Sequence, residues 1–418
     1  MKRVALVFPT MWDAKQLAAC RITWDTRFEV ELAAPSDEDC QWDFDILSYI
    51  DDIVRRYRDR VDGIASSSDY PGATVAAAVA TRLGLPGSAP QNVLRCSHKY
   101  YSRLAQQEIV PEATAGFHLV DPERPSTDIG FPCFVKPVKG AFSIMSQRIG
   151  NRRELEAFLD KPSTTEFLNQ YVFIFNRLIR GLTDYELDGN YFLAEEILTG
   201  QQVTVEGFVA DGDVRLLGIV DSIRHPRTKS FVRFDYPSSL SGAIQARIAD
   251  IVSRLIVHLG LDNTLFNVEM MYHERADRVA IVEVNPRMCG QFADLYAKVD
   301  GTSAYTVALE LATGQTPCVR HREGTHRVAS SVPLRIFEHR RVQRAPSAAE
   351  VASVEADFPG TLVWSECKTG DVLSDFESVE DGKSARYGVV NLGASDRKAL
   401  ATLQEDVLES LDYRFEPL

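Results

Sequence analysis

The sequence predicts a mixed α/β protein (α+β) made of several compact units. The chain of 418 residues is longer than one typical domain, and its 45% hydrophobic and 25% charged content is the balance of an ordinary globular protein. Strand and helix patterns alternate in the first part of the chain, whereas two later strand patterns are separated only by a short polar turn. The first arrangement favours a parallel sheet and the second an antiparallel hairpin.

The N-terminal stretch is predicted to form a parallel α/β unit. Strand patterns alternate with helical patterns there, and this order places helices between parallel strands. A polar run, Ser66-Ser67-Ser68-Asp69, follows the third strand, where open α/β sheets bind ligands. We expect it either to contact a substrate or to cap the next helix. The predicted strands are 3–8, 28–34 and 61–65, and the predicted helices are 49–58 and 73–83, the second ending at Gly84.

The rest of the chain is predicted to mix strands with a few helices. Strands are expected to dominate residues 131–209, interrupted by one helix near 152–159 that begins at Asn151, a favourable N-cap. Residues 241–259 show the pattern of a long amphipathic helix ending at Gly260. Further predictions are a helix at 98–108, strands at 265–272 and 278–284, and a mixed α/β tail from about 325 to 418.

The composition argues against several classes of protein. A formal net charge of −13 without a basic patch argues against nucleic-acid binding. The seven cysteines are scattered and form no Cys-x-x-Cys pair, which argues against a zinc site and a disulfide framework. The apolar run at the N-terminus is too short for a signal peptide, and no apolar stretch approaches the roughly 20 residues that span a bilayer. The expected location is therefore a reducing cytoplasm, without a membrane partner.

The most informative segment is a predicted hairpin that is apolar on one face and acidic on the other. Because side chains alternate along a strand, Asn267 shares a face with Glu269, and Glu283 shares one with Asn285. Same-face residues of an antiparallel pair lie roughly 4.5–8 Å apart, so Glu269, Glu283 and Asn285 can converge on one point. Buried carboxylates need neutralising, and Mg²⁺ prefers such oxygen ligands, shared with substrate phosphates. Arg287, two residues beyond, suits a phosphoryl group or a tetrahedral oxyanion.

A second segment is an apolar strand that ends at Lys136 and leads into a short loop containing Gly140 and Ser143. A lysine in this position needs an anionic partner, and the backbone N–H groups of the loop can bind phosphate oxygens. The spacing is neither that of a Walker A loop nor that of a dinucleotide-binding motif. The residues alone leave an equal alternative, in which Lys136 only extends its charged end from the strand into water.

Taken in order, these segments resemble the ATP-grasp superfamily. The resemblance rests on Phe-Val-Lys-Pro-Val at 134–138, Ala-Glu-Glu-Ile-Leu-Thr-Gly at 194–200, Val-Glu-Gly at 205–207, Asn-Val-Glu at 267–269 and Glu-Val-Asn-Pro-Arg at 283–287. The glutamate at 269 followed by Glu-x-Asn-Pro-Arg is a specific signature. The similarity covers about residues 95–320, and within the superfamily the chain looks most like the carboxylate–amine ligases, including the L-amino-acid (dipeptide) ligases.

The resemblance implies an ATP-grasp fold with a parallel α/β domain before it and an α/β subdomain after it. It also implies a homodimer formed through the N-terminal unit. The implied units are a pre-ATP-grasp α/β domain at 1–97, a central ATP-grasp lobe with a phosphate-binding flap at 98–197, a catalytic lobe with the metal-binding hairpin at 198–320, and a C-terminal α/β subdomain at 321–418.

The same resemblance implies a set of ATP contacts. Two lysines are expected at the phosphates, under a flap at about 139–144, and three consecutive residues are expected to bind adenine through their backbone. Gln202 stands where many relatives have an acidic residue for the ribose hydroxyls, and a glutamine can still donate or accept a hydrogen bond there. The implied cofactor-binding residues are Lys99, Lys136, Ser143, Glu195, Glu196, Ile197 and Gln202.

The resemblance places metal and substrate contacts in the second half of the chain. Mg²⁺, or Mn²⁺ in its place, is expected at the hairpin, and Arg287 and Lys136 are expected to act on the reacting phosphoryl group. Three further positions are either substrate contacts or ordinary surface residues: Glu206 on a strand facing the nucleotide, and His225 and Lys229 in a basic loop. The implied metal ligands are Glu269, Glu283 and Asn285.

The implied function is an ATP- and Mg²⁺-dependent carboxylate–amine ligase. Such an enzyme activates a small carboxylic acid, with amino acids as candidate substrates, as an acyl phosphate. It then couples the acid to an amine as an amide and releases ADP and phosphate. Two alternatives stay open at this point: a carboxylase or purine-pathway type of ligase that uses bicarbonate or another small acid, and a non-catalytic nucleotide-binding protein. No Met-Lys-Met motif is present, which disfavours a self-biotinylated carboxylase.

Overall fold

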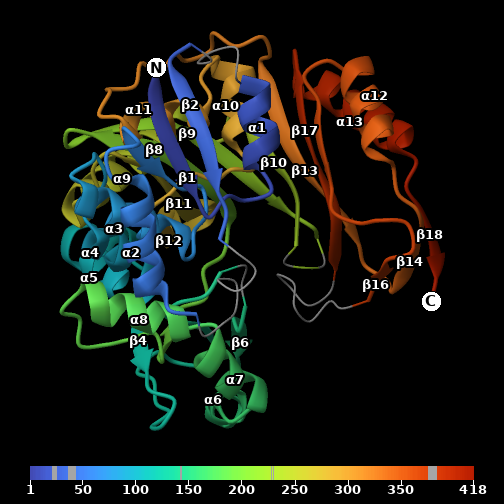
Figure 1. The fold of residues 1–418 in the computed structure, drawn as a ribbon. Helices are drawn as coiled ribbons and strands as arrows, with labels where there is room; N and C mark the ends of the chain where they lie inside the picture. Colours follow the sequence, from blue (N-terminus) through green and yellow to red (C-terminus); the bar gives the residue numbers. More distant parts are fainter. Residues whose placement is uncertain (21–25, 36–43, 142–143, 227, 229, 375–383) are drawn as a thin grey trace.

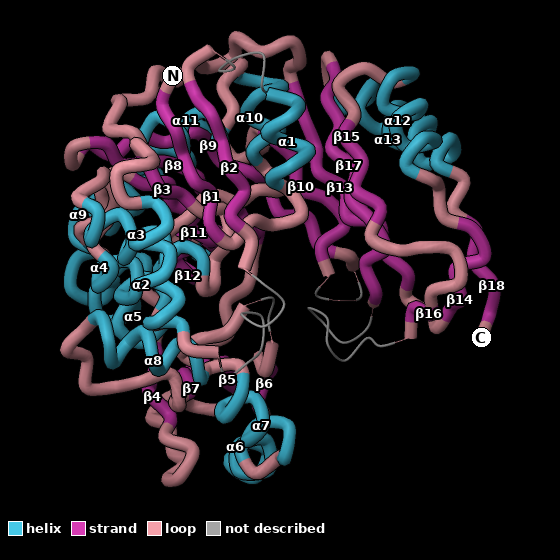
Figure 2. The backbone as a smooth tube through the Cα atoms, viewed as in Figure 1, coloured by secondary structure: helices cyan, strands magenta, loops and turns pink. Residues whose placement is uncertain are grey.

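The computed structural model describes residues 1–20, 26–35, 44–141, 144–226, 228, 230–374 and 384–418. They form four sheets, two of three strands, one of four and one of eight (Figure 1). Figure 2 shows helices arranged along the outside of these sheets, and the mixed α/β class predicted from the sequence is confirmed. No helix in the described part of the chain is both long enough and apolar enough to cross a membrane.

The N-terminal unit is the parallel α/β unit that the sequence predicts. Its three strands pair in parallel in the order β2-β1-β3. The buried stripe of α2, with Ile50 and Ile53, packs against α3 and the sheet, and α3 ends where Gly84 adopts a φ of 68°. The elements are β1 (Lys2–Val7), α1 (Asp13–Cys20), β2 (Phe28–Ala33), α2 (Ile46–Tyr57), β3 (Gly63–Ala65), α3 (Gly72–Leu83) and α4 (Pro90–Ser97).

A second unit is built on an antiparallel sheet of four strands in the order β4-β7-β5-β6. Helix α6 and apolar side chains such as Val135 and Phe192 close its small core. The N-cap predicted for α6 is confirmed, because the Asn151 side chain accepts the N–H of Glu154. The elements are α5 (Lys99–Ile109), η3 (Pro111–Ala113), β4 (Phe117–Val120), β5 (Cys133–Pro137), β6 (Gln147–Ile149), α6 (Arg152–Leu159) and β7 (Phe192–Glu195).

The expectation that strands dominate residues 131–209 is wrong for residues 162–182. Two helices lie there, α7 (Pro162–Gln170) and α8 (Phe173–Leu182). Pro162 occupies the first helical position, where its missing N–H removes no hydrogen bond. Phe175 and Leu178 belong to a helical stripe of α8 that is buried in the same core as α2. The helical period was therefore present in the sequence, and the strand prediction overlooked it.

The largest sheet has eight strands in the order β12-β11-β8-β9-β10-β13-β17-β15. It runs across the predicted boundary at residue 320, because β10 pairs with β13. That boundary stays a prediction. The strands are β8 (Gln201–Ala210), β9 (Asp213–Arg224), β10 (Phe231–Tyr236), β11 (Thr264–His273), β12 (Arg278–Asn285), β13 (Val328–Ile336), β15 (Leu362–Ser365) and β17 (Ala385–Ala394).

The two faces of the large sheet have different partners. On one face α9 (Gly242–Leu259) packs its apolar stripe on residues such as Val205 and Val268. On the other face α10 (Ala293–Asp300) and α11 (Ala304–Ala312) cover part of the sheet and join it to the N-terminal unit. Helices α12 (Ala348–Asp357) and α13 (Arg397–Leu411) flank the far end, beside a small sheet of β14 (Arg340–Arg344), β16 (Val372–Leu373) and β18 (Arg414–Pro417) (Figure 1).

Candidate functional site

The acidic hairpin predicted from the sequence is confirmed in its geometry. Strands β11 and β12 pair antiparallel, with Asn267 opposite Asn285 and Glu269 opposite Glu283. The short helix η4 (Glu274–Ala276) reverses the chain between the two strands. The four polar side chains alternate with apolar ones such as Val268 that pack toward α9. The polar set therefore lies on the opposite face of the large sheet.

The two glutamates of this hairpin influence each other strongly. Burial, and then repulsion by Glu283, raises the pKa of Glu269. Burial also opposes the ionisation of Glu283, but Lys99 and Lys136 outweigh it and hold the pKa of Glu283 below its usual value. Glu269 therefore gains most from an added cation, which would relieve both its repulsion and its desolvation. A divalent cation fits this pair of carboxylates.

Asn285 needs one rotation to complete the predicted ligand set. Its Nδ2 donates to Glu283 Oε1 at 3.5 Å and to Asn267 Oδ1 at 3.4 Å. For Asn285 to bind a metal through oxygen beside Glu283, its side-chain amide must be flipped, which exchanges the positions of Nδ2 and Oδ1. Among the described residues, no three His, Cys, Asp or Glu side chains gather as metal ligands. The remaining ligands of Mg²⁺ would thus be waters and phosphate oxygens.

Lys136 lies inside the protein, and the alternative in which it only extends into water is wrong. It is 6% exposed, and its Nζ lies 2.8 Å from Glu195 Oε2 and donates to the Val282 carbonyl at 3.2 Å. Glu195 also accepts from Arg103 Nε at 2.7 Å. Burial opposes the ionisation of Glu195, but Arg103 and Lys136 outweigh it and lower its pKa to about 2. An ammonium has three donors, so Lys136 retains one for a further acceptor.

Lys99 connects the second unit to the hairpin. Its Nζ donates to the Gly140 carbonyl at 2.7 Å and lies 3.4 Å from Glu283 Oε2. Its backbone N–H donates to the Val138 carbonyl at 2.9 Å, which fixes the start of α5 beside the end of β5. Lys99 and Lys136 are therefore both placed to act on Glu283 and on any anion bound beside it.

The segment predicted to bind adenine follows the end of β7. The backbone N–H of Glu196 donates to the Gly116 carbonyl at 3.0 Å, and its carboxylate accepts from Arg278 Nη2 at 2.5 Å and Nη1 at 3.0 Å. Ile197 is 37% exposed. Both the backbone N–H and the carboxylate of Glu196 are therefore already hydrogen-bonded within the protein. The adenine contacts of residues 195–197 stay a prediction. They would use the backbone N–H and carbonyl groups that these hydrogen bonds leave free.

Gln202 lies beside a predicted metal ligand. Its Nε2 donates to Glu269 Oε2 at 2.9 Å, and its Oε1 accepts from the guanidinium of Arg224 on β9. Burial lowers the pKa of Arg224, and the charge of Glu269 partly compensates. The structure thus places Gln202 between a cation and the acidic hairpin. Its predicted ribose contact stays a prediction.

Of three further predicted contacts, His225 alone lies within the described residues. Ser143 of the flap and Lys229 of the basic loop lie outside the described residues. His225 directly follows β9, its backbone N–H donates to the Ser230 carbonyl at 2.8 Å, and its ring centroid lies 4.7 Å from that of Phe337. The substrate roles assigned to His225 and Lys229 and the nucleotide role of Ser143 stay predictions.

Arg287 follows the hairpin directly and faces the N-terminal unit. Its Nε lies 3.7 Å from Asp69 Oδ1, and its Nη1 makes a long contact of 3.4 Å with the Met288 carbonyl. The other oxygen of Asp69 lies 3.2 Å from Lys139 Nζ. Lys139 is buried, with its Nζ 5.0 Å from the centroid of the Tyr70 ring. The site thus draws one charged residue from each of three segments that lie far apart in the sequence.

Glu206 lies on the same sheet face as the hairpin ligands. It is fully buried on β8, opposite Asn267, and its Oε1 accepts the backbone N–H of Cys289 in the loop after Arg287. Burial raises the pKa of Glu206 to about 7. The same loop is held at the other end by Gln291, whose Nε2 donates to Ser331 Oγ at 2.8 Å. Glu206 therefore fixes the loop that carries Arg287, and its predicted substrate contact stays a prediction.

Three cations of the site were missed by the sequence reasoning, although each carries a recognisable signal. Arg103 lies one helical turn after Lys99 on α5, so the two share a face. Lys139 comes three residues after Lys136, next to a glycine. Arg224 alternates with Ser222, which pairs with Gln202 across β8 and β9. The periodicity of helix and strand alone could have assigned Arg103 and Arg224 to the site. Lys139 could be assigned only once the position of its partner Asp69 was known.

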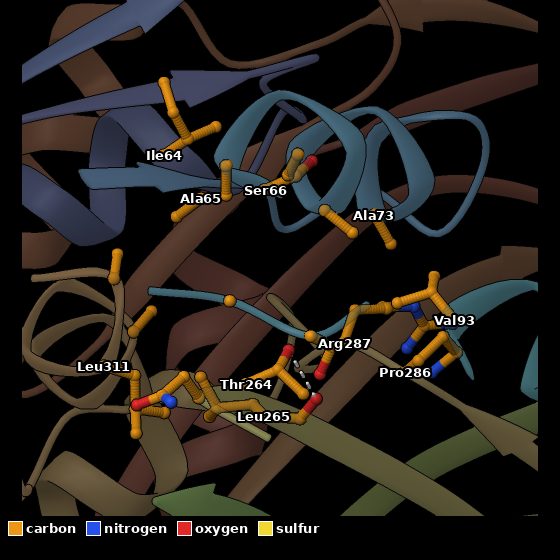
Figure 3. A pocket seen from close by; sticks show the side chains of 18 of the residues that line it. Ile64, Ala65, Ser66, Ala73, Val93, Thr264, Leu265, Pro286, Arg287 and Leu311 are labelled. Carbon is orange, nitrogen blue, oxygen red and sulfur yellow. Dashed lines mark hydrogen bonds between the residues drawn. The ribbon is translucent and has the colours of Figure 1, made fainter. Parts of the chain in front are cut away.

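A small pocket lies between the N-terminal unit and the base of the hairpin (Figure 3). Ala65 and Ser66 line one side, Thr264 and Leu265 line the opposite side, and Arg287 lies at one end. Its volume of about 60 Å³ is far below the roughly 300–1,000 Å³ of sites that bind small molecules. The cavity is therefore a packing gap between units and holds neither a nucleotide nor an amino acid.

Comparison with known proteins adds to this geometry. Residues 129–294 match the profile described as an ATP-grasp domain. No functionally curated protein matches the sequence. Among solved structures, the chain is similar to an L-amino acid ligase from Bacillus licheniformis, with 17% identity, a TM-score of 0.75, and coverage of 100% of this chain and 99% of that one.

Other solved structures have a similar fold and are named for different reactions. Phosphoribosylglycinamide synthetase from Anaerococcus prevotii has 15% identity and a TM-score of 0.66, with 100% of both chains covered. The biotin carboxylase domain of the Hydrogenobacter thermophilus 2-oxoglutarate carboxylase, solved with MgADP and bicarbonate, has 14% identity and a TM-score of 0.66, with 99% of this chain and 90% of that one covered. Identities this low establish the fold, and they leave the reaction to be argued from the site.

Proposed function

Because this protein carries an ATP-grasp domain within an ATP-grasp fold, we propose that it is an ATP- and Mg²⁺-dependent carboxylate–amine ligase. A small carboxylic acid would be activated as an acyl phosphate and joined to an amine as an amide, with release of ADP and phosphate. Amino acids are the first candidates for both substrates, since the similar structure from Bacillus licheniformis is named an L-amino acid ligase. Cytoplasmic location and a homodimer remain part of this proposal.

One observation carries the proposal, namely a half-buried pair of carboxylates with several cations around it. Glu269 and Glu283 lie opposite each other, and Glu283 is approached by Lys99 and influenced by Lys136. Arg287 is two residues beyond the end of the hairpin pair. A polyphosphate with a divalent cation satisfies both halves of this arrangement, because the metal neutralises the carboxylates while the lysines and the arginine bind phosphate oxygens.

In the first half-reaction, an oxygen of the acid's carboxylate attacks the γ-phosphorus of ATP. The bond between that phosphorus and the bridging oxygen breaks, and ADP leaves with the electron pair. Lys136 donates its remaining N–H to the phosphates, and Arg287 stabilises negative charge on the transferring group. Held at Glu269, Glu283 and a rotated Asn285, Mg²⁺ would supply charge neutralisation and alignment of the phosphate oxygens.

In the second half-reaction, the nitrogen of a neutral amine attacks the acyl carbon. The carbon–oxygen bond to phosphate breaks, phosphate leaves with the electron pair, and the nitrogen loses a proton to solvent. The tetrahedral intermediate carries an oxyanion, which the planar guanidinium of Arg287 can bind. Fixing the loop through Glu206 and Cys289 keeps that guanidinium beside the hairpin.

A bicarbonate-using enzyme is the second candidate. The structure with MgADP and bicarbonate shares the fold over 99% of this chain, and bicarbonate would occupy the place of the organic acid. The two proposals differ in what must be added to ATP for ADP to appear. Release that depends on bicarbonate favours the carboxylating reaction, and release that depends on an acid together with an amine favours the ligase.

The test is a matrix of amino acids, small carboxylates and amines with Mg·ATP, followed by ADP, phosphate and mass measurements of products. We expect acid-dependent ADP release and one amide product. Glu283→Gln should reduce turnover by at least about 100-fold, because it removes a metal ligand, while the melting temperature is kept or raised. Asp277→Asn is the matched control, since Asp277 is an exposed acid on the same hairpin that pairs with Arg247.

Three outcomes would contradict the proposal. Full activity of Glu283→Gln would remove the metal assignment. ADP release with bicarbonate alone would transfer support to the carboxylating reaction. Mg·ATP binding without turnover across the whole matrix would support the non-catalytic alternative.

A further inference from the structure

Asp69 lies at the carboxyl end of a parallel strand, in a loop held firmly by hydrogen bonds. The loop follows β3, where Ser66 Oγ donates to the Val7 carbonyl at 2.8 Å and Ser67 Oγ donates to Asp13 Oδ2 at 2.8 Å. The N–H of Ser68 donates back to Ser66 Oγ at 3.2 Å. The position of Asp69 is thus set by the N-terminal sheet, and its side chain is aimed out of that unit.

The carboxylate of Asp69 bridges two cations from two other parts of the chain. Oδ2 lies 3.2 Å from Lys139 Nζ and Oδ1 lies 3.7 Å from Arg287 Nε. Burial opposes the ionisation of Asp69, but Lys139, Arg287 and Lys99 outweigh it and lower its pKa to about 2. Asp69 therefore carries its charge over the whole physiological range, so both contacts join opposite charges throughout that range.

Capping of the next helix does not explain Asp69. The N-cap of α3 is Pro71, and no side chain caps that helix. Of the two roles expected for the Ser66–Asp69 run, capping is therefore wrong for Asp69. What the side chain does contact is the residue proposed to stabilise the reacting phosphoryl group.

We propose that Asp69 is a positioning residue that aligns Arg287 and Lys139 for the first half-reaction, an inference that rests on the ligase function proposed above. Asp69 engages the Nε side of Arg287, and one Nη1 N–H makes the long contact with the Met288 carbonyl, which leaves the second Nη1 N–H and both on Nη2 for substrate oxygens. Lys139 is packed near the rings of Tyr70 and Phe175, at 5.0 and 5.7 Å, and Asp69 keeps its buried ammonium close to Arg287. Without the carboxylate the two cations repel each other and lose their alignment.

Through this alignment of Arg287 and Lys139, the N-terminal unit also contributes to the reaction. Asp69 belongs to that unit, Lys139 begins the flap segment of the second unit, and Arg287 belongs to the large sheet. The Asp69 carboxylate contacts the cations from both other parts and so contributes to their relative placement. A displacement of about 1 Å in such a contact can cost roughly 10²-fold in rate, so the effect of losing Asp69 falls on catalysis.

The experiment compares Asp69→Asn and Asp69→Glu with wild type. Asp69→Asn keeps the size of the side chain and removes its charge, whereas Asp69→Glu keeps the charge with a longer reach. Asp62→Asn is the matched control, because Asp62 is another paired acid of the N-terminal unit, bound to Lys2 and to the N–H of Arg3. For each variant one measures kcat, the Kd of Mg·ATP, the melting temperature, and the rate at which hydroxylamine traps the acyl phosphate as a hydroxamate.

We expect Asp69→Asn to lower kcat and the hydroxamate rate together by roughly 10–100-fold, with the Kd of Mg·ATP and the melting temperature unchanged. Asp69→Glu should lie between Asp69→Asn and wild type, and Asp62→Asn should match wild type. Wild-type kcat in Asp69→Asn overturns the inference, as does a loss of kcat matched by equal losses in ATP affinity and melting temperature. If wild type itself forms no hydroxamate with any acid, the proposed function fails instead.

Discussion

Glu206 shows how burial alone can change the chemistry of a single side chain. It sits on β8 with no exposed surface, and its carboxyl accepts the N–H of Cys289. Burial raises its pKa to about 7, against 4.5 for the free group. At neutral pH the residue is therefore partly protonated, unlike Asp69, which three cations keep ionised.

The raised pKa of Glu206 predicts a pH dependence of stability. Below pH 4.5 both folded and unfolded states are protonated; between 4.5 and 7 the unfolded state ionises first, so unfolding becomes easier as pH rises. The glutamine in Glu206→Gln does not ionise, so this variant does not lose folding stability in this way as pH rises. Its stability relative to wild type should therefore grow by about 3 kcal/mol between pH 4.5 and 7.5, measured by denaturation at each pH. A difference between the two proteins that does not change with pH would refute the assignment.

The residues of the site differ in how far the sequence could predict them. Glu269, Glu283 and their asparagine neighbours lie on two strands joined by a short turn, so alternation was enough to place them on one face. Lys136 was ambiguous from the sequence, because its partner Glu195 lies on a strand paired through tertiary structure. The bridge from Asp69 to Lys139 spans a separation of 70 residues, and no local pattern encodes such a contact.

At the scale of elements, the connection from β7 to β8 joins the predicted adenine segment to the large sheet. Gly200 precedes β8 with a φ of 127°, a conformation open to glycine. A Cβ at this position would meet the carbonyl oxygen and carbon of Tyr272 on β11. The close approach keeps the connection against the hairpin that carries Glu269.

Gly200→Ala should therefore lower the melting temperature and weaken ATP binding. Gly212→Ala is the matched control, because Gly212 also has a positive φ, of 76°, but a Cβ there has no neighbour within 4 Å. Both positions have a positive φ that strains any other residue, and only Gly200→Ala adds the collision with Tyr272. Calorimetric melts and ATP titrations of the two variants measure the difference. Equal effects of both substitutions would show that the contact with Tyr272 is unimportant.

Element prediction succeeded where the pattern was regular and ended in a clear signal. The helix predicted at 241–259 is confirmed as Gly242–Leu259, with Gly260 at a φ of 69° as its C-cap. Residues 162–182 fell within the stretch 131–209 that was predicted to be mostly strand, yet they form α7 and α8. Their apolar side chains follow a helical period, and that stripe is buried.

At the scale of the whole molecule, three units supply one polar centre. The N-terminal unit gives Asp69, the second unit gives Lys99 and Lys136, and the large sheet gives Glu269 and Glu283. The fold class and the acidic hairpin could be predicted from the sequence, because both follow from local periodicity and short-range pairing. The continuity of the eight-stranded sheet across residue 320 could not, since β10 and β13 pair over a long stretch of chain.

The central claim is that the acid is activated as an acyl phosphate at this centre. The most direct test uses an acid labelled with ¹⁸O in its carboxylate, incubated with the protein, Mg·ATP and an amine, and mass spectrometry of the phosphate released. If the carboxylate oxygen attacks the γ-phosphorus, one ¹⁸O appears in phosphate for each amide formed. Phosphate that contains no ¹⁸O while the amide is formed would contradict the account.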